Sequence, residues 1–450
     1  MTYYTMNVMR KTIVYFFIVA VFFAACKKDE THVFNQTPDE RLNEALSKYQ
    51  AQLSGAANGW NGVLYPKGGG AYFFYFKFND ANRVQMVSDF DSASAVTLKE
   101  SSYRLKALQQ PSLIFDTYSY IHVLSDPDAS VNGGTFGAGL LSDFEFFFND
   151  STTADSIKLT GRVNGSTMLL TPASAEQATA YTSGQFNIDL FKESLANILQ
   201  YFKRLTVGAV SYEVNINPVT KLVIFTWIDS QGNTQTLSTT FYYTLNGIAF
   251  GKPLVDGSTV IAGLSDPVWS SSTNTLTVNT GGGAPATITG AGKPLVVDTA
   301  APRRWWQYAV SGGTYWISDN GFHVNGVDDA FGLKTLATDS STFYYLMYWP
   351  KPGSQTYDVF LPAYLISATN QVDIIYGIAQ NPNFLTDGRV TFRYLGDLLV
   401  GPYPTTGPAA LSRDQLLTSQ GYYFVQTGPI NYDMVSASDS RIWVSWVDPF

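Results

Sequence analysis

The chain has 450 residues, which corresponds to two or three domains of ordinary size. Charged residues make up only 14% and aromatic residues 15%, and this composition excludes a disordered chain or a coiled coil. The net charge of -8 gives a nucleic acid no electrostatic basis for binding. Three histidines and one cysteine exclude a disulfide framework and a cysteine-rich zinc or iron-sulfur site.

The N-terminus predicts export. Arg10 and Lys11 precede an uncharged run over residues 12–25, which is shorter than the span of about 20 residues that crosses a membrane comfortably. Ala24 and Ala25 then precede Cys26, and this arrangement resembles the lipobox of bacterial lipoproteins, whose cysteine is acylated and becomes the mature N-terminus. We therefore predict a signal peptide over 1–25 and a membrane anchor at Cys26. The alternative is an ordinary cleaved signal followed by a stray cysteine.

A short tether is predicted to follow the anchor, over residues 26–36. Its charged start, residues 27–30, resembles the tether of Bacteroidetes lipoproteins that are sent to the outer membrane and often to its outer face. The first folded element is then a helix. Thr37 and Glu40 are spaced for a capping box, and Gly55 is placed to end the helix.

After the first helix the apolar residues alternate with a period of two, which predicts strands over 72–78, 103–107, 143–148 and 221–228. Four Asn-Gly pairs lie between apolar runs and favour tight hairpin turns, so we expect antiparallel meanders. Two further helices are predicted, one along the amphipathic stripe from Leu190 to Phe202 and one that begins at Ser412.

Glycine, proline and alanine replace periodic apolar residues for some twenty positions around residue 295, which indicates a domain boundary there. We predict an N-terminal β-rich domain with flanking helices over 37–295 and a C-terminal β-rich domain over 296–450. The fold class is therefore mainly β with a few helices (α+β), built from antiparallel meander sheets.

Several short motifs in the N-terminal domain support a family resemblance. They are 72–78, 88–91 (Ser-Asp-Phe-Asp), 99–105, 115–120, 126–128 and 142–146. Together they resemble the Bacteroidetes outer-membrane lipoprotein family catalogued as domain of unknown function 4302, over roughly residues 26–290. The resemblance implies a setting among outer-membrane lipoproteins of nutrient uptake and their porter proteins. It implies no catalytic residue.

The sequence lacks the common motifs of hydrolases and nucleotide-binding enzymes, Gly-x-Ser-x-Gly, the phosphate-binding loop and His-Glu-x-x-His. His122 is more typical of a hydrogen-bonded core residue than of a catalytic base. Asp143 and Glu145 are two apart on a predicted strand, where they would share a face and form a glycosidase acid-base pair. The alternative is a solvated outer face, and Asp89 and Asp91 are open to the same two interpretations.

No metal or other cofactor is predicted. Asp126, Asp128 and Asn132 offer oxygen ligands at a spacing that partly matches a calcium loop. The glycine falls late and Gly137 stands where a bidentate glutamate is needed, so a plain turn is the favoured interpretation.

Six of the nine tryptophans follow residue 295, and four of them are candidates for ligand binding: Trp305, Trp306, Trp316 and Trp349. Trp305 and Trp306 are adjacent, so on a strand they would face opposite sides of the sheet. We therefore expect at least one exposed indole, which would serve as an aromatic platform for a sugar or a peptide. The alternative for each tryptophan is core packing.

The function predicted from these features is that of a lipid-anchored, noncatalytic accessory or binding lipoprotein of the outer membrane, linked to glycan or peptide uptake. Its expected partners are the membrane, through acylated Cys26, and an outer-membrane uptake complex, with no nucleic acid. Two alternatives stay open: a carboxylate-dependent glycoside hydrolase and a structural or adhesive surface lipoprotein.

Overall fold

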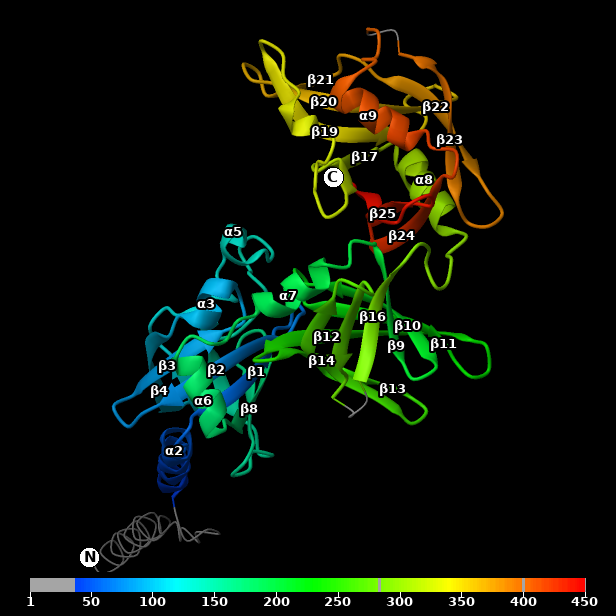
Figure 1. Ribbon diagram of the computed structural model, residues 1–450. Coiled ribbons are helices and arrows are strands. Elements are labelled where there is room, and N and C mark those ends of the chain that lie inside the picture. The colour runs from blue at the N-terminus through cyan, green and yellow to red at the C-terminus, as the bar shows by residue number, and fades with distance from the viewer. Residues whose placement is uncertain (1–36, 282–284, 399–400, 450) are drawn as a thin grey trace, which may run out of the picture.

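The computed structural model describes residues 37–281, 285–398 and 401–449, which form three β units in chain order (Figure 1). Two closed barrels of eight strands are followed by a third, larger sheet, and all of the described strand pairs are antiparallel. The prediction of a mainly β fold made of antiparallel meanders with few helices is confirmed. The predicted N-terminal domain holds both barrels, and residue 295 lies between the second barrel and the third unit.

The first barrel is an up-and-down ring in which β1 also pairs with β8. Its strands are β1 Trp60–Tyr65, β2 Tyr72–Phe78, β3 Arg83–Ser88, β4 Lys99–Ala107, β5 Pro111–Phe115, β6 Glu145–Phe148, β7 Ile157–Gly161 and β8 Thr167–Pro172. The helices before, within and after it are α2 Pro38–Gly55, α3 Ser92–Val96, α4 Tyr120–Val123, α5 Ala129–Asn132, α6 Ala175–Thr182 and α7 Asp189–Ala196.

The second barrel closes in the same way, through pairing of β9 with both β10 and β16. Its strands are β9 Phe202–Val207, β10 Val210–Asn217, β11 Leu222–Ile228, β12 Thr234–Thr244, β13 Gly247–Asp256, β14 Thr259–Ser270, β15 Thr275–Asn279 and β16 Pro285–Ala291. Ring closure gives every strand of each barrel two neighbours, although some strands, such as β10 beyond Glu213, pair on one side only over part of their length.

The third unit begins with helix α8 Ala301–Gly312, and its sheet also closes because β17 pairs with both β19 and β26. The strands are β17 Trp316–Ser318, β18 Phe322–Val324, β19 Ser341–Trp349, β20 Asp358–Ile366, β21 Gln371–Asp373, β22 Ile378–Phe384, β23 Val390–Asp397, β24 Tyr422–Gly428, β25 Asn431–Ser436 and β26 Ile442–Val447. A 3-10 turn, η1 Leu333–Thr335, and helix α9 Gly407–Leu416 complete the unit.

Strand β2 shows why the two barrels lie side by side. Its alternate aromatic residues Tyr72, Phe74, Phe76 and Phe78 fill the first barrel, as the period of two predicts. Phe73 and Tyr75, on the opposite face, are buried in the same cluster as the core of the second barrel. Both faces of this strand are therefore apolar, and its outer face packs the first barrel against the second.

Local sequence signals placed some helices correctly and others not. The Thr37–Glu40 capping box forms as predicted, with Glu40 N donating to Thr37 Oγ1 at 3.2 Å. The stripe predicted as a helix through Phe202 is shorter, because Phe202 already pairs with Ala291 in the second barrel. Ser412 does not begin a helix. It lies inside α9, where its hydroxyl donates to the Pro408 carbonyl.

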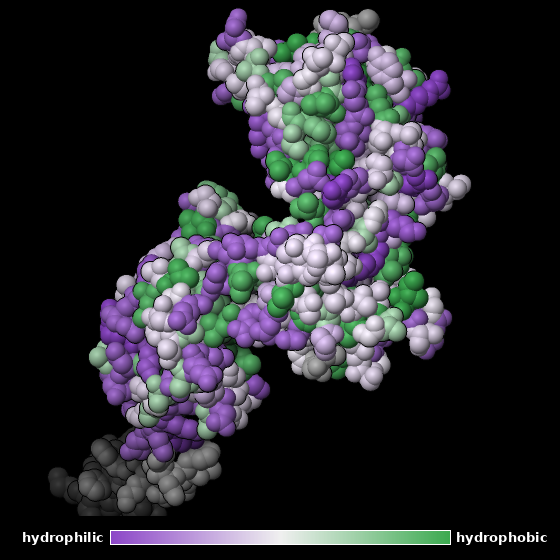
Figure 2. Space-filling model, viewed as in Figure 1, coloured by the Kyte–Doolittle hydropathy of each residue, from purple (hydrophilic) through white to green (hydrophobic). Residues whose placement is uncertain are grey.

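The visible surface mixes hydrophilic and hydrophobic residues over all three units (Figure 2). The C-terminal unit lies at the far end of the molecule from α2, and it meets the second barrel between β24 and the strands β9 and β10 (Figure 1). Of the helices that the structure describes, none is both long enough and apolar enough to cross a membrane.

Candidate functional site

A groove runs between the second barrel and the C-terminal unit, and it encloses about 930 Å³. Strands β10 to β12 form its floor, the linker around residues 294–298 forms one end, and strands β24 to β26 form the opposite wall. Its volume lies within the range of sites that hold small ligands.

The floor follows from strand register. Val214, Val223 and Phe225 point into the barrel and are at most 2% exposed, so their neighbours along each strand face outward. Cross-strand pairing then places side by side a row of uncharged residues: Asn215 with Ile224, Asn217 with Leu222, and Thr226 with Thr236. The floor therefore offers amide and hydroxyl groups around an apolar strip.

Aromatic and acidic residues form the wall. The Tyr201 hydroxyl donates to Asp433 Oδ2 at 2.6 Å, and the Tyr201 ring packs edge-on against Trp443, 5.4 Å between centroids. Trp443 also stacks on His323 at 3.6 Å. Burial raises the pKa of Asp433, and the hydrogen bonds that Ser445 and Tyr201 donate to its carboxylate oppose this shift. Burial also raises the pKa of Tyr201, and the nearby Asp433 carboxylate raises it further. Tyr201 therefore keeps its proton at neutral pH and serves as a donor.

Most charges at the groove are paired within the protein. Glu213 binds the Arg204 guanidinium and also accepts from the backbone N of Leu295 at 2.8 Å, which fastens the linker to the barrel. Asp298 pairs with Arg304 at 2.7 Å. Lys203 differs, because its amine donates to the Gln200 carbonyl at 3.0 Å and burial lowers its pKa to about 8. A perturbed amine in a groove marks a candidate binding site.

The structure corrects part of the expected aromatic platform. Trp305 and Trp316 are fully buried and stack on each other, 5.9 Å between centroids, in the core of the C-terminal unit. Trp305 and Trp306 lie on helix α8 rather than on a strand, so the argument from opposite strand faces does not apply to them. Neither Trp305 nor Trp316 presents an exposed face.

The other two tryptophans are half-buried. Trp306 donates from its indole N to Asp358 Oδ2 at 2.7 Å, and the Lys351 ammonium lies 4.9 Å from its ring. Trp349 lies on the outer face of β19, 5.6 Å from the ring of Tyr315. A platform role for this pair stays a prediction.

Asp143 and Glu145 do not form the pair that a glycosidase would need. Asp143 is 3% exposed and lies before β6, where its carboxylate accepts from the backbone N of Val163, Asn164 and Ser166 and from the Ser166 hydroxyl. Glu145 lies on the strand and faces Arg162, 3.7 Å away. Asp143 therefore holds the turn between β7 and β8 in place.

His122 is a core residue, as the favoured interpretation had it. Its Nδ1 accepts from the backbone N of Ser119 and its Nε2 donates to the carbonyl of Phe115, both at 3.1 Å. Burial lowers its pKa, so the ring is neutral at physiological pH.

The calcium-like segment is a network of turns. Asp126 accepts from the Tyr118 hydroxyl and from Asp128 N, and Asp128 accepts from Ser130. The Asn132 amide nitrogen donates to two carbonyls, so local hydrogen bonds occupy the polar side chains of the segment. Within the described ranges, no group of three or more His, Cys, Asp or Glu is placed to hold a metal ion. Cys26 lies outside the described residues.

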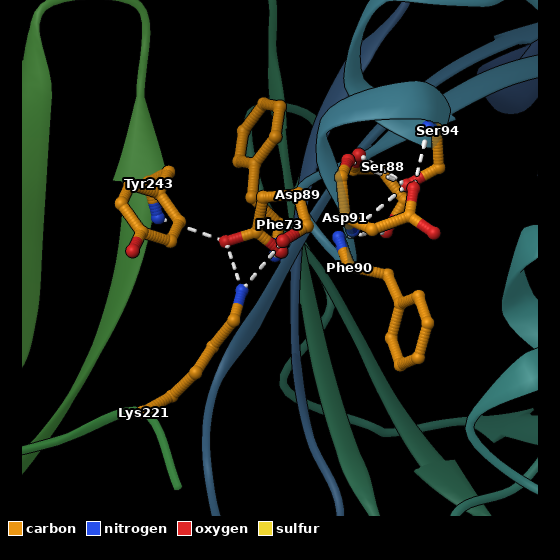
Figure 3. A network of polar contacts seen from close by, with 8 residues as sticks. All are labelled: Phe73, Ser88, Asp89, Phe90, Asp91, Ser94, Lys221 and Tyr243. Carbon is orange, nitrogen blue, oxygen red and sulfur yellow. Dashed lines mark hydrogen bonds and ion pairs between the residues drawn. The ribbon is translucent and has the colours of Figure 1, made fainter. Parts of the chain in front are cut away.

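The Ser-Asp-Phe-Asp motif lies at the contact between the two barrels (Figure 3). Asp89 is fully buried; its Oδ1 accepts from Phe73 N at 2.8 Å, and its Oδ2 accepts from Tyr243 N at 2.8 Å and from Lys221 Nζ at 2.6 Å. Burial raises the pKa of Asp89 and lowers that of Lys221, while their mutual attraction opposes both shifts. Asp91 instead caps helix α3 through Ser94 N. The motif joins the barrels and forms no open acidic face.

Sequence reasoning missed the residues of the groove: Lys203, Asp433 and Trp443. Trp443 was counted among the C-terminal tryptophans but no local pattern distinguished it. Tyr201 and Asp433 are 232 residues apart, and only the packing of two units brings them together.

Comparison with known proteins gives one family and two distant structures. Residues 30–269 match the family described as a domain of unknown function (DUF4302). A search of curated proteins finds no match. Among solved structures, a protein of unknown function from the DUF3598 family of Nostoc punctiforme has 9% identity and a TM-score of 0.14, over 53% of this chain and 96% of that one. The H. pylori beta clamp in complex with 5-chloroisatin has 10% identity and a TM-score of 0.13, and the match covers 91% of this chain and 98% of that one. Such low scores carry no argument about function.

Proposed function

The chain belongs to the family described as a domain of unknown function (DUF4302), and on this premise we propose that it is a lipid-anchored, noncatalytic binding lipoprotein of the outer membrane. We propose that it captures a glycan or peptide nutrient for an uptake complex. The single observation that carries this proposal is the groove between the second barrel and the C-terminal unit.

The chemistry of the groove favours binding without turnover. None of the described residues that line it is a histidine or a cysteine. Of its carboxylates, Glu213 and Asp298 are held in ion pairs and Asp433 accepts from Tyr201. Groups engaged in this way position a ligand but are poorly placed to exchange protons with it.

The position of the groove also fits an anchored protein. Helix α2 starts the described chain at the end of the first barrel that lies away from the C-terminal unit (Figure 1). A tether over residues 26–36 reaches at most about 3.5 Å per residue, or roughly 40 Å. An anchor at Cys26 would thus hold the first barrel near the membrane and direct the groove outward.

Fractionation of cells tests the anchor. The wild-type chain is expected in the outer-membrane fraction, and Cys26→Ala is expected to be released, because several acyl chains hold a protein far more firmly than none. If Cys26→Ala still fractionates with the outer membrane, the anchor is wrong.

A binding screen with glycan and peptide arrays tests the groove. Ile224→Asp places a charge on the floor and is expected to abolish binding, whereas Val260→Asp, at a similarly exposed aliphatic residue of the same barrel outside the groove, is expected to leave it intact. The bound ligand should be recovered unchanged. Product formation that is lost in Glu145→Gln would instead support the glycoside hydrolase.

A further inference from the structure

The charges around the groove leave one cation without an anionic partner. Of the described lining residues, only Lys203 and Arg304 are cationic, and Arg304 pairs with Asp298 at 2.7 Å. Lys203 forms no ion pair in the part of the chain that the structure describes, and its amine donates to the Gln200 carbonyl. A half-buried ammonium held only by a carbonyl is open to an anionic group from a ligand.

The groove also contains strand edges, to which an extended peptide could add through its backbone groups. Residues 214–217 of β10 pair only with β11, and residues 423–428 of β24 pair only with β25. The choice of a saccharide therefore depends on the side chains of the groove, and capture of a peptide in place of a saccharide would contradict it.

Those side chains suit a ligand that is rich in hydroxyl groups. Asn215, Thr226 and Thr236 lie on the floor, and Tyr201 and Trp443 lie on the wall. Amides and hydroxyls both donate and accept hydrogen bonds, and aromatic rings supply apolar area for the CH faces of sugar rings. The chain's net charge of -8 opposes a polyanion, so an acidic ligand should carry few carboxylates.

Resting on the proposed binding function, we infer that the ligand is a short saccharide that carries a single carboxylate, which binds the Lys203 ammonium. The sugar hydroxyls bind the Asn and Thr side chains of the floor. This assigns a chemical class to the ligand and names Lys203 as the residue that selects it.

The test compares matched saccharides with the full-length chain. The probes are saccharides of two to four rings with one glucuronic or sialic acid, and the same saccharides after carboxyl reduction, which replaces the carboxylate by an alcohol. Calorimetry is expected to show at least about tenfold tighter binding of the acidic form. Lys203→Met should remove this preference, while Lys203→Arg, which stays charged, should keep it.

The pH dependence gives a second readout. With a pKa of about 8, the Lys203 amine is mostly protonated at pH 7 and about one-tenth protonated at pH 9. Binding of the acidic probe by the wild type should therefore weaken about tenfold between pH 7 and pH 9. Lys203→Arg should show no such loss, because the guanidinium keeps its proton.

The outcomes separate this inference from the function on which it rests. If acidic and reduced saccharides bind equally well, or if Lys203→Met keeps the preference for the acidic form, the carboxylate inference is overturned and the binding function stands. If neither form of any saccharide binds, the inference and the glycan-binding function both fail. Melting temperatures of the Lys203 variants, measured in parallel, confirm that each one is folded.

Discussion

Replacing Asp89 by alanine should destabilise the contact between the two barrels more than any exposed charge change. In the native chain, Asp89 binds Lys221 and accepts from one backbone N–H in each barrel, that of Phe73 in β2 and that of Tyr243 in β12. Asp89→Ala leaves the Lys221 ammonium buried beside the rings of Tyr72 and Tyr243 without an anion. It also leaves both backbone donors unpaired.

The expected loss follows from these contacts. Removing one partner of a buried ion pair costs about 3–5 kcal/mol, and each unpaired buried donor costs about 1–3 kcal/mol. These terms share the same atoms and do not add, so we expect a total of about 3–5 kcal/mol, a large part of the stability of an ordinary domain. The matched control is Glu100→Ala, because the Arg83–Glu100 pair is 42% and 45% exposed and should contribute less than about 1 kcal/mol.

Urea unfolding followed by circular dichroism measures the loss, and hydrogen exchange locates it. Peptides that contain Phe73 and peptides that contain Tyr243 should both exchange faster in Asp89→Ala, because one carboxylate serves both barrels. A double-mutant cycle with Lys221→Met should give a coupling of about 1–3 kcal/mol. If Asp89→Ala costs no more than Glu100→Ala, or if exchange rises in one barrel only, the assignment of Asp89 as the joint between the barrels is wrong.

Three further predictions concern the burial of the tryptophans, the need for a metal and the Lys203 amine. Trp305→Ala should cost about 3–5 kcal/mol of unfolding free energy because the indole is fully buried, whereas half-buried Trp349→Ala should cost clearly less in the same urea titration. EDTA should leave the melting temperature unchanged, and a fall that calcium restores would point back to the loop at Asp126. The methylated Lys203 amine should titrate near pH 8 by carbon NMR, and a value above 10 would contradict its burial. Between pH 8 and 10.5 Lys203 has released a proton in the folded chain that it still holds in the unfolded chain, so the stability of the wild type relative to Lys203→Met should rise with pH over this range.

The local parts of the fold could be predicted because they depend on neighbouring residues. The capping box at Thr37 and the alternation of Tyr72 to Phe78 act over a few positions, and both appear in the structure. Helix α8 was missed although its signals are present. Proline stands at its start, Gly313 ends it with a positive φ of 64°, and Ala301, Trp305 and Ala309 are spaced four apart and are all buried.

The role of charged residues was harder to predict, because a strand pattern does not show what packs on its outer face. Asp89 and Asp143 both follow the pattern of exposed acidic residues, yet one lies between two barrels and the other inside a turn. The partners of Asp89 include Lys221 and Tyr243, which are more than 130 residues away in the sequence. Only the meeting of separate units decides whether such a carboxylate faces water.

The groove depends on this same long-range assembly. At one end, Tyr201 N donates to the Ser440 carbonyl at 2.8 Å and Ser440 Oγ donates to the Ala291 carbonyl at 2.7 Å, so the C-terminal unit is fixed to both strands at one end of the second barrel's closing strand pair. The hydroxyl of Tyr201 continues this contact to Asp433. A groove whose wall and floor are held together by such hydrogen bonds is largely formed before a ligand arrives, which lowers the entropy lost on binding. Selection among ligands of similar shape then depends on the charged group that has no ionic partner in the described chain, which is the Lys203 amine.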